Sequence, residues 1–228
     1  MGMFIVLEGL DGAGKSTQIK MLTEWLESAG RKVKYLHFPR FDAPVYGDMI
    51  ARFLRGEFGG VEDVNPYLVA LLYAGDRADA AATIRGWEQE GYVVIVDRYV
   101  YSNVGYQCAK VSDESERKAL KEWILRTEFE QFAIPRPTAS LFLDVPFAFT
   151  ERKLTEVREG DDRDYLNGKK DIHESSLDLQ RSVRQVYLDA AEAEERFFVV
   201  DCADAQGGMA SAEVIFERLR SVVEPLLD

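Results

Sequence analysis

The feature that most constrains this chain is a glycine-rich segment near its N-terminus. Residues Gly9 to Ser16 read GLDGAGKS and fit the pattern G-x-x-x-x-G-K-[ST]. The apolar run Met3–Leu7 before the segment predicts a strand, and Ser16–Ala29 after it places apolar residues on one helical face. A strand, a glycine-rich turn and a helix in this order are typical of a P-loop, whose backbone N–H groups bind phosphate. The segment therefore predicts a nucleoside triphosphate site.

The polar residues of this P-loop have expected roles in binding ATP and Mg²⁺. Lys15 brings a full positive charge to the β- and γ-phosphate oxygens, and the Ser16 hydroxyl is a ligand for Mg²⁺. We expect ATP to be the co-substrate and Mg²⁺ the metal. The residues expected to bind ATP are Gly9, Leu10, Asp11, Gly12, Ala13, Gly14, Lys15, Ser16 and Thr17.

Strand and helix patterns alternate along the rest of the chain. Helices are predicted from Pro66 to about Glu90, after the N-cap Asn65, and from Asp113 to about Phe132. Further strands are predicted at Lys32–Phe38, Tyr92–Asp97, Thr138–Val145 and Phe197–Asp201. Alternation of this kind predicts a parallel sheet with helices on its faces. We expect one α/β domain over residues 1–228, a three-layer P-loop NTPase fold with a five-stranded parallel sheet.

One segment departs from this pattern. Residues 158–170 read REGDDRDYLNGKK and are almost without apolar side chains. A solvated loop is the ordinary interpretation of such a segment. Its arginines and its position between two predicted helices also fit a mobile lid that closes over a site.

Composition bounds the class of protein. The chain has 228 residues, of which 46% are hydrophobic and 30% charged, as in ordinary globular domains. Its net charge of −12 disfavours nucleic acid and anionic membranes as partners. Cys108 and Cys202 show no metal-binding or disulfide spacing. We find no signal peptide or stretch of transmembrane length, and we expect a cytoplasmic protein.

A second motif ends the predicted strand Tyr92–Asp97. Four β-branched residues, Val93 to Val96, are followed by Asp97 and Arg98. Open parallel sheets bind their ligands at the carboxyl ends of the strands. Asp97 is therefore a candidate to hold Mg²⁺ through water, beside Ser16 of the P-loop.

Several motifs are spread along the chain. They are Phe4–Ser16 (FIVLEGLDGAGKS), Phe38-Pro39-Arg40, Asp97–Tyr106 (DRYVYSNVGY), Asp171–Glu174 (DIHE) and Tyr187. Together these motifs resemble those of thymidylate kinases over nearly the whole chain. The resemblance implies transfer of the γ-phosphoryl group of ATP to thymidine monophosphate (dTMP), giving dTDP and ADP on the route to dTTP. It also implies a homodimer, for which the apolar helix around Ala70–Ile84 is a candidate surface.

The resemblance assigns residues to the base and sugar of dTMP. Tyr73 and Arg77 lie four residues apart and so share a helix face. They match the positions of an aromatic ring stacked on thymine and an Arg that donates to its carbonyl. Asn103 would complete base recognition. Tyr106 would lie beside the deoxyribose, and Asp11 beside its 3′-hydroxyl.

Other residues are expected at the phosphates. Arg40, Arg77 and Arg98 are candidates to neutralise the acceptor phosphate, since the guanidinium fork suits phosphate oxygens. Phe38 precedes Arg40 and is placed in the same substrate site. This chain resembles bacterial-type members, which supply a catalytic arginine from the lid, and it has Glu174 at an acidic position near the metal. The residues expected in catalysis are Lys15, Asp11, Asp97, Arg98, Arg158 and Arg163.

Other functions are weighed against this one. A deoxynucleoside kinase shares the P-loop but usually carries Glu-Arg-Ser after the third strand, where this chain has Asp97-Arg98-Tyr99. A GTPase would need an Asn-Lys-x-Asp motif, which the sequence lacks. A non-catalytic nucleotide-sensing module stays open as an alternative, although intact Lys15, Ser16 and Asp97 argue against it.

Overall fold

The fold is built around a parallel sheet of five strands in the computed structural model, which describes residues 2–61, 63–155, 161–166 and 177–227. The strands lie in the order β2-β3-β1-β4-β5. All four neighbouring pairs are parallel, so crossover connections that contain helices join the strands. The strands are β1 (Met3–Gly9), β2 (Val33–His37), β3 (Val93–Asp97), β4 (Ala139–Asp144) and β5 (Phe197–Asp201).

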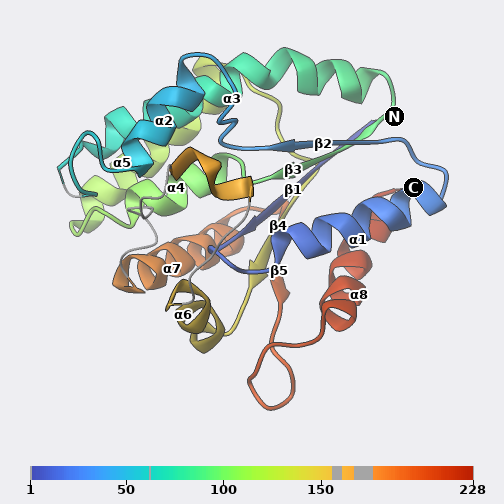
Figure 1. Cartoon of the computed structure of the whole chain (residues 1–228). Helices are drawn as coiled ribbons and strands as arrows, with labels where there is room; N and C mark the ends of the chain where they lie inside the picture. The colour runs from blue at the N-terminus through green and yellow to red at the C-terminus, as the bar shows by residue number, and fades with distance from the viewer. Residues whose placement is uncertain (1, 62, 156–160, 167–176, 228) are drawn as a thin grey trace.

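Helices cover both faces of the sheet (Figure 1). One face carries α1 (Lys15–Ser28) and α8 (Ala212–Val223). The other carries α3 (Pro66–Gln89), α4 (Val100–Cys108), α5 (Glu114–Arg126) and α7 (Leu177–Ala193). The remaining elements are α2 (Tyr46–Leu54), α6 (Phe147–Thr155), the π-helix η1 (Thr127–Gln131) and the 3₁₀-helices η2 (Asp161–Leu166) and η3 (Glu224–Leu226).

The central strand shows why the sheet is covered twice. Phe4 and Val6 of β1 pack toward α3, α4, α5 and α7, whereas Ile5 and Leu7 pack toward α1 and α8. All four side chains are fully buried. A strand buried on both faces reads as a continuous apolar run, which is the signal that predicted it. The expected three-layer α/β fold is confirmed.

The helix predictions succeed where caps mark the ends. The Asn65 side chain accepts a hydrogen bond from the backbone N–H of Tyr67 at the start of α3. The Asp113 side chain accepts one from the N–H of Glu116 at the start of α5. The second predicted helix was expected to continue to about Phe132, but α5 ends at Arg126 and continues as the π-helix η1.

The register of the strands brings the expected site residues to one edge of the sheet. Asp97 of β3 pairs with Leu7 of β1 on one side and with His37 of β2 on the other. The P-loop begins at Gly9, directly beyond this pair. Both chain ends lie at the opposite side of the molecule (Figure 1). Among the described helices, none is long and apolar enough to cross a membrane.

Candidate active site

The P-loop wraps around the start of α1. Gly14 is the N-cap of α1 and has a φ of 82°, a left-handed conformation that favours glycine. The Lys15 ammonium donates to the carbonyl oxygens of Gly9 and Leu10 over 3.4 and 3.3 Å. Burial and the nearby charge of Arg98 lower the pKa of Lys15. Ser16 and Thr17 are exposed in the first turn of α1, where a helix N-terminus favours phosphate.

Asp97 lies across the edge of the sheet from this lysine. Its Oδ1 is 4.0 Å from the Lys15 Nζ, and its Oδ2 is 3.5 Å from the Nδ1 of His37. Burial acts to raise the pKa of Asp97, but the charge of Lys15 and the hydrogen bond from His37 outweigh it and hold the pKa below its ordinary value. Asp97 is therefore ionised at neutral pH.

The same residues fit Mg²⁺ by their chemistry. The Asp97 Oδ1 is buried and has no hydrogen-bond partner within the described part of the chain. Such an orphaned carboxylate oxygen suits a magnesium-bound water, and the Ser16 hydroxyl adds a second oxygen donor. Glu174, the third expected metal residue, lies outside the described residues.

Arg98, Asp11 and Tyr106 meet beside the P-loop. Arg98 Nη2 donates to Asp11 Oδ1 over 2.7 Å, and the Tyr106 hydroxyl donates to Asp11 Oδ2 over 2.7 Å. The guanidinium carbon of Arg98 also lies 5.4 Å from the centre of the Tyr106 ring. Three expected site residues from two separate segments, the P-loop and Asp97–Tyr106, are thus brought together. Gln180 of α7 was not predicted from the sequence. Its Nε2 donates to Asp11 Oδ2, the oxygen that also accepts from Tyr106, over 3.4 Å.

Glu8 supports this cluster from beneath, and its role was not predicted. The side chain is fully buried. Its Oε1 accepts from the backbone N–H groups of Tyr99 and Ser102 over 3.0 and 3.2 Å, at the start of α4. Its Oε2 accepts from the Ser102 hydroxyl over 2.6 Å and from the Tyr187 hydroxyl over 3.0 Å. A Glu in an otherwise apolar strand, immediately before a P-loop, was the available signal.

The expected base-recognition residues form a second buried network. Arg77 is 1% exposed, and its Nε and Nη2 donate to Glu128 over 2.5 and 2.7 Å. Asn103 Nδ2 donates to Glu128 Oε1 over 2.9 Å and to the Ala70 carbonyl oxygen over 3.0 Å. Glu128 already compensates the charge of Arg77. The structure therefore argues against Arg77 as a neutraliser of the acceptor phosphate and leaves base recognition as its expected role.

Arg40 is likewise held by carboxylates. Its Nε donates to Asp76 over 2.8 Å, and its Nη2 donates to Asp79 over 2.6 Å. Phe38 is 1% exposed and packs against Tyr99, which makes it a core side chain here. Among the candidates for the acceptor phosphate, Arg98 contacts the P-loop directly, through Asp11.

Tyr73 lies on α3, four residues before Arg77. It is partly buried and packs against the small apolar cluster of Ile50, Phe53, Leu54 and Val69, between α2 and α3.

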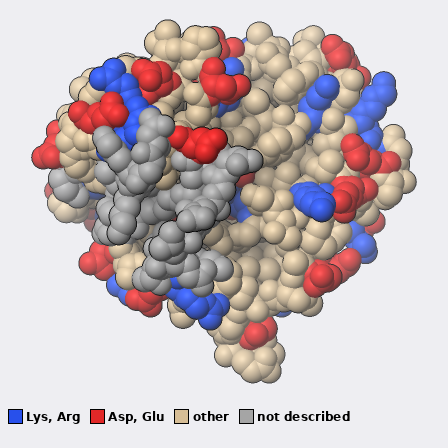
Figure 2. Space-filling view, viewed as in Figure 1, with Lys and Arg blue, Asp and Glu red and all other residues tan. Residues whose placement is uncertain are grey.

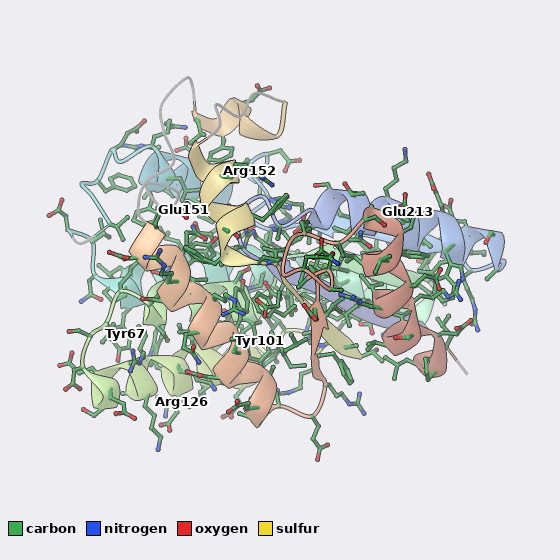
Figure 3. The ribbon with its side chains drawn as sticks, turned by 90° about the horizontal axis from the view of Figure 1, so that it is seen from below. Tyr67, Tyr101, Arg126, Glu151, Arg152 and Glu213 are labelled. Atoms are coloured by element: carbon green, nitrogen blue, oxygen red, sulfur yellow. The ribbon has the colours of Figure 1, made fainter. Side chains whose placement is uncertain are left out.

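The two expected lid arginines are described only in part. Arg158 lies outside the described residues. Arg163 belongs to η2, and only its backbone is described. Tyr165 of η2 stacks on Phe41 with 3.8 Å between ring centres, and its carbonyl oxygen accepts from Arg55 over 2.8 Å. The described part of the segment therefore rests against the α2 side of the molecule. Figure 3 labels Glu151 and Arg152 on α6, the helix that precedes it in the chain.

The P-loop, the buried Asp97 and the arginine that follows it, carried on a five-stranded parallel sheet, define a P-loop phosphotransferase of the nucleoside monophosphate kinase class. The family model for thymidylate kinase matches residues 7–207. The chain belongs to the thymidylate kinase family, whose members use ATP as phosphate donor.

Individual relatives match over almost their full length. A thymidylate kinase of Mycobacterium tuberculosis is 35% identical over 212 residues, which cover 92% of this chain and 96% of that protein. A probable thymidylate kinase of Thermococcus kodakarensis is 34% identical over 230 residues, covering 99% and 98%. The solved structure of thymidylate kinase from Candida albicans matches with a TM-score of 0.74 at 25% identity, covering 98% of this chain and 92% of that one. The expected family and fold are confirmed.

Proposed function

We propose that this protein transfers the γ-phosphoryl group of MgATP to dTMP, giving dTDP and ADP in the synthesis of dTTP. Membership of the thymidylate kinase family supports the reaction. The observation that carries it in this chain is the meeting of Arg98 and Tyr106 on Asp11 of the P-loop. A phosphate-binding arginine, a ring suited to a sugar and an acceptor for a sugar hydroxyl thereby lie next to the ATP site.

The chemistry needs charge stabilisation more than proton transfer. The acceptor oxygen of a monophosphate is already ionised, so no strong general base is required. Lys15 binds the β- and γ-phosphate oxygens and meets the charge that spreads over them in the transition state. Mg²⁺, held through Ser16 and Asp97, would supply further positive charge at the β- and γ-phosphates.

Arg98 and Asp11 act together on the acceptor in this proposal. Arg98 binds the dTMP phosphate, while Asp11 keeps the guanidinium in place and accepts from the 3′-hydroxyl. Arg158 or Arg163 of the lid adds a charge at the transferring phosphoryl. Closure of the lid excludes water, which would otherwise hydrolyse ATP.

We also propose a homodimer in the cytoplasm. On α3, the exposed apolar side chains lie near its N-terminus: Tyr67, Leu68 and Leu71 are 36%, 62% and 42% exposed. Tyr67 packs edge-on against Trp123 of α5 with 5.1 Å between ring centres, and it lies at the outer edge of the molecule in Figure 3. Farther along Ala70–Ile84, apolar residues are used by the chain's own core, which moves the candidate surface toward Leu68 and Leu71.

Charge supports small-molecule substrates over nucleic acid. On the face shown in Figure 2, Lys and Arg side chains are interspersed with Asp and Glu side chains. The whole chain carries a net charge of −12, which repels a phosphodiester backbone. Local arginines such as Arg98 are then needed to receive a phosphate ester.

The test is formation of ADP that depends on added dTMP. Thymidine, AMP and GMP should be compared with dTMP at equal concentration. Activity with thymidine would favour a deoxynucleoside kinase, and activity with AMP or GMP would favour another monophosphate kinase. ATP binding without turnover of any acceptor would favour a non-catalytic nucleotide-sensing module.

A further inference from the structure

Glu128 lies in a position that no local pattern in the sequence indicates. It is the second residue of η1, the π-helix that replaces the continuation of α5, and its side chain is completely buried. π-helical turns are rare and often occur at functional sites. The carboxylate contacts both α3, through Arg77, and α4, through Asn103.

The first consequence concerns the amide of Asn103. Its two neighbours on one side, the Ala70 carbonyl and the Glu128 carboxylate, can only accept hydrogen bonds. The NH₂ group must therefore face them. The Asn103 Oδ1 is then left as a buried acceptor, and it has no hydrogen-bond partner among the residues that the structure describes. Leaving a buried acceptor without a hydrogen bond costs free energy, so a donor group on a bound ligand would be stabilised there.

The second consequence concerns the guanidinium of Arg77. Its Nε and Nη2 form a fork on the two oxygens of Glu128, so Nη1 lies outside that fork. Arg77 Nη2 and Asn103 Nδ2 donate to the same oxygen, Glu128 Oε1. The remaining guanidinium donor and the remaining amide acceptor are therefore held by one shared anchor.

We propose that Glu128 is a positioning residue that sets the base preference of the acceptor site, by presenting a donor from Arg77 beside an acceptor from Asn103. The inference rests on the proposed function. A 4-oxo pyrimidine with a protonated N3, such as thymine, offers the complementary acceptor and donor. A 4-amino pyrimidine such as cytosine offers a donor and an acceptor in the reverse order, which leaves both pairs mismatched.

The decisive experiment compares dTMP with dCMP in wild type and in Glu128→Gln. A glutamine has one acceptor oxygen and one NH₂ group, so it cannot accept all three hydrogen bonds that Arg77 and Asn103 donate to the Glu128 carboxylate. Where the glutamine NH₂ group replaces Oε1, the Asn103 amide turns its oxygen toward that group and its own NH₂ group toward the base. We expect the ratio of kcat/KM for dTMP to kcat/KM for dCMP to fall roughly tenfold or more, because a mismatched buried hydrogen bond carries discrimination of at least that size.

A second variant of Glu128 and a control variant distinguish a change in base preference from a general loss of stability. Glu128→Asp withdraws the carboxylate by one methylene and should also lower the ratio, and it replaces Glu128→Gln if that variant does not fold. Ile124→Ala, in the buried face of α5, should lower the melting temperature while leaving the ratio unchanged. The proposal is overturned if a folded Glu128 variant keeps the wild-type ratio, or if Ile124→Ala shifts it equally.

The activity of wild type distinguishes failure of the proposed function from failure of the role given to Glu128. If the wild-type protein forms no ADP on addition of dTMP, the acceptor itself is wrong and the inference falls with it. If wild type turns over dTMP well and dCMP poorly, and the Glu128 variants lose activity on both in the same proportion, only the positioning role of Glu128 is wrong.

Discussion

Arg98 and Asp11 form an ion pair 2.7 Å long that joins the residue after β3 to the P-loop. Arg98 holds this position with a φ of 66°, a conformation that costs a non-glycine residue on the order of 1–3 kcal/mol. The backbone N–H of Arg98 donates to Leu7, and the next N–H, of Tyr99, donates to Glu8. The strain is therefore maintained by β1, and it directs the arginine toward the P-loop.

Asp11→Asn should weaken the use of dTMP without unfolding the protein. The change removes the charge that orients Arg98 and weakens the acceptor for Tyr106. Hydrogen bonds to charged groups contribute about 1.5–3 kcal/mol, so kcat/KM for dTMP should fall roughly 10- to 100-fold. Steady-state kinetics measure this. Asp178→Asn is the matched control, because Asp178 forms an exposed pair with Arg181 on α7 and should change nothing.

Lys15→Ala should leave a folded protein whose kinase activity is lower by several orders of magnitude. Lys15 meets charge that grows on the phosphates in the transition state. Lys20→Ala, in the exposed part of the same helix, is the control and should keep wild-type kcat. Retention of more than about a tenth of the wild-type rate by Lys15→Ala, a loss of only ~1.4 kcal/mol, would contradict the P-loop assignment.

Glu8 should make stability depend on pH. Burial raises the pKa of Glu8 above its ordinary value of 4.5. Above pH 4.5 the unfolded chain loses this proton while the folded chain still binds it. The free energy of unfolding therefore falls as pH rises through the raised pKa. Glu8→Gln removes this contribution, so the stability advantage of wild type over the variant should be smaller at pH 8 than at pH 5.

Urea denaturation of wild type and Glu8→Gln at the two pH values measures this difference. Glu24→Gln is the control, since Glu24 is exposed on α1 and its removal should not change the pH dependence. An advantage of wild type that stays constant or grows between pH 5 and pH 8 would show that Glu8 carries no raised pKa in the folded protein.

The parts of the fold that the sequence predicted are those with a local signal. Buried strands such as β3 are continuous β-branched runs, and α3 and α5 begin at capping residues. The helix α4 was not predicted as such, because every one of its residues is buried and it shows no alternation of polar and apolar faces. The P-loop was recognised because its residues have fixed spacing.

The buried carboxylates of the site were not predicted, because their partners lie far away in the sequence. Glu128 and Arg77 are 51 positions apart, and Glu8 and Ser102 are 94 apart. Partners at such separations meet only because the sheet order and the helix packing bring them together. Residues expected to contact a substrate were therefore predicted from motifs, whereas the buried carboxylates that hydrogen-bond to them or to their neighbours were not.

Replacing at least one of the two lid arginines should lower kcat. Arg158→Ala and Arg163→Ala are compared at saturating ATP and dTMP, where binding effects are removed. At least one variant should lose roughly 10²-fold or more, the scale expected for a charge that stabilises the transition state. If both variants change only KM, these arginines bind substrate and do not act on the transferring phosphoryl.

Tyr106→Ala should relax the preference for deoxyribose over ribose. Tyr106 is 7% exposed, and its hydroxyl is bound to Asp11, the expected partner of the 3′-hydroxyl. A ring packed at the sugar leaves no room for a 2′-hydroxyl and gives it no hydrogen-bond partner, which penalises ribonucleotides. Removal of the ring should narrow the gap in kcat/KM between dTMP and its ribonucleotide analogue. Tyr106→Phe keeps the ring and removes only the hydroxyl, so it should keep most of the gap. If Tyr106→Ala stays active with an unchanged gap, the ring does not select the sugar.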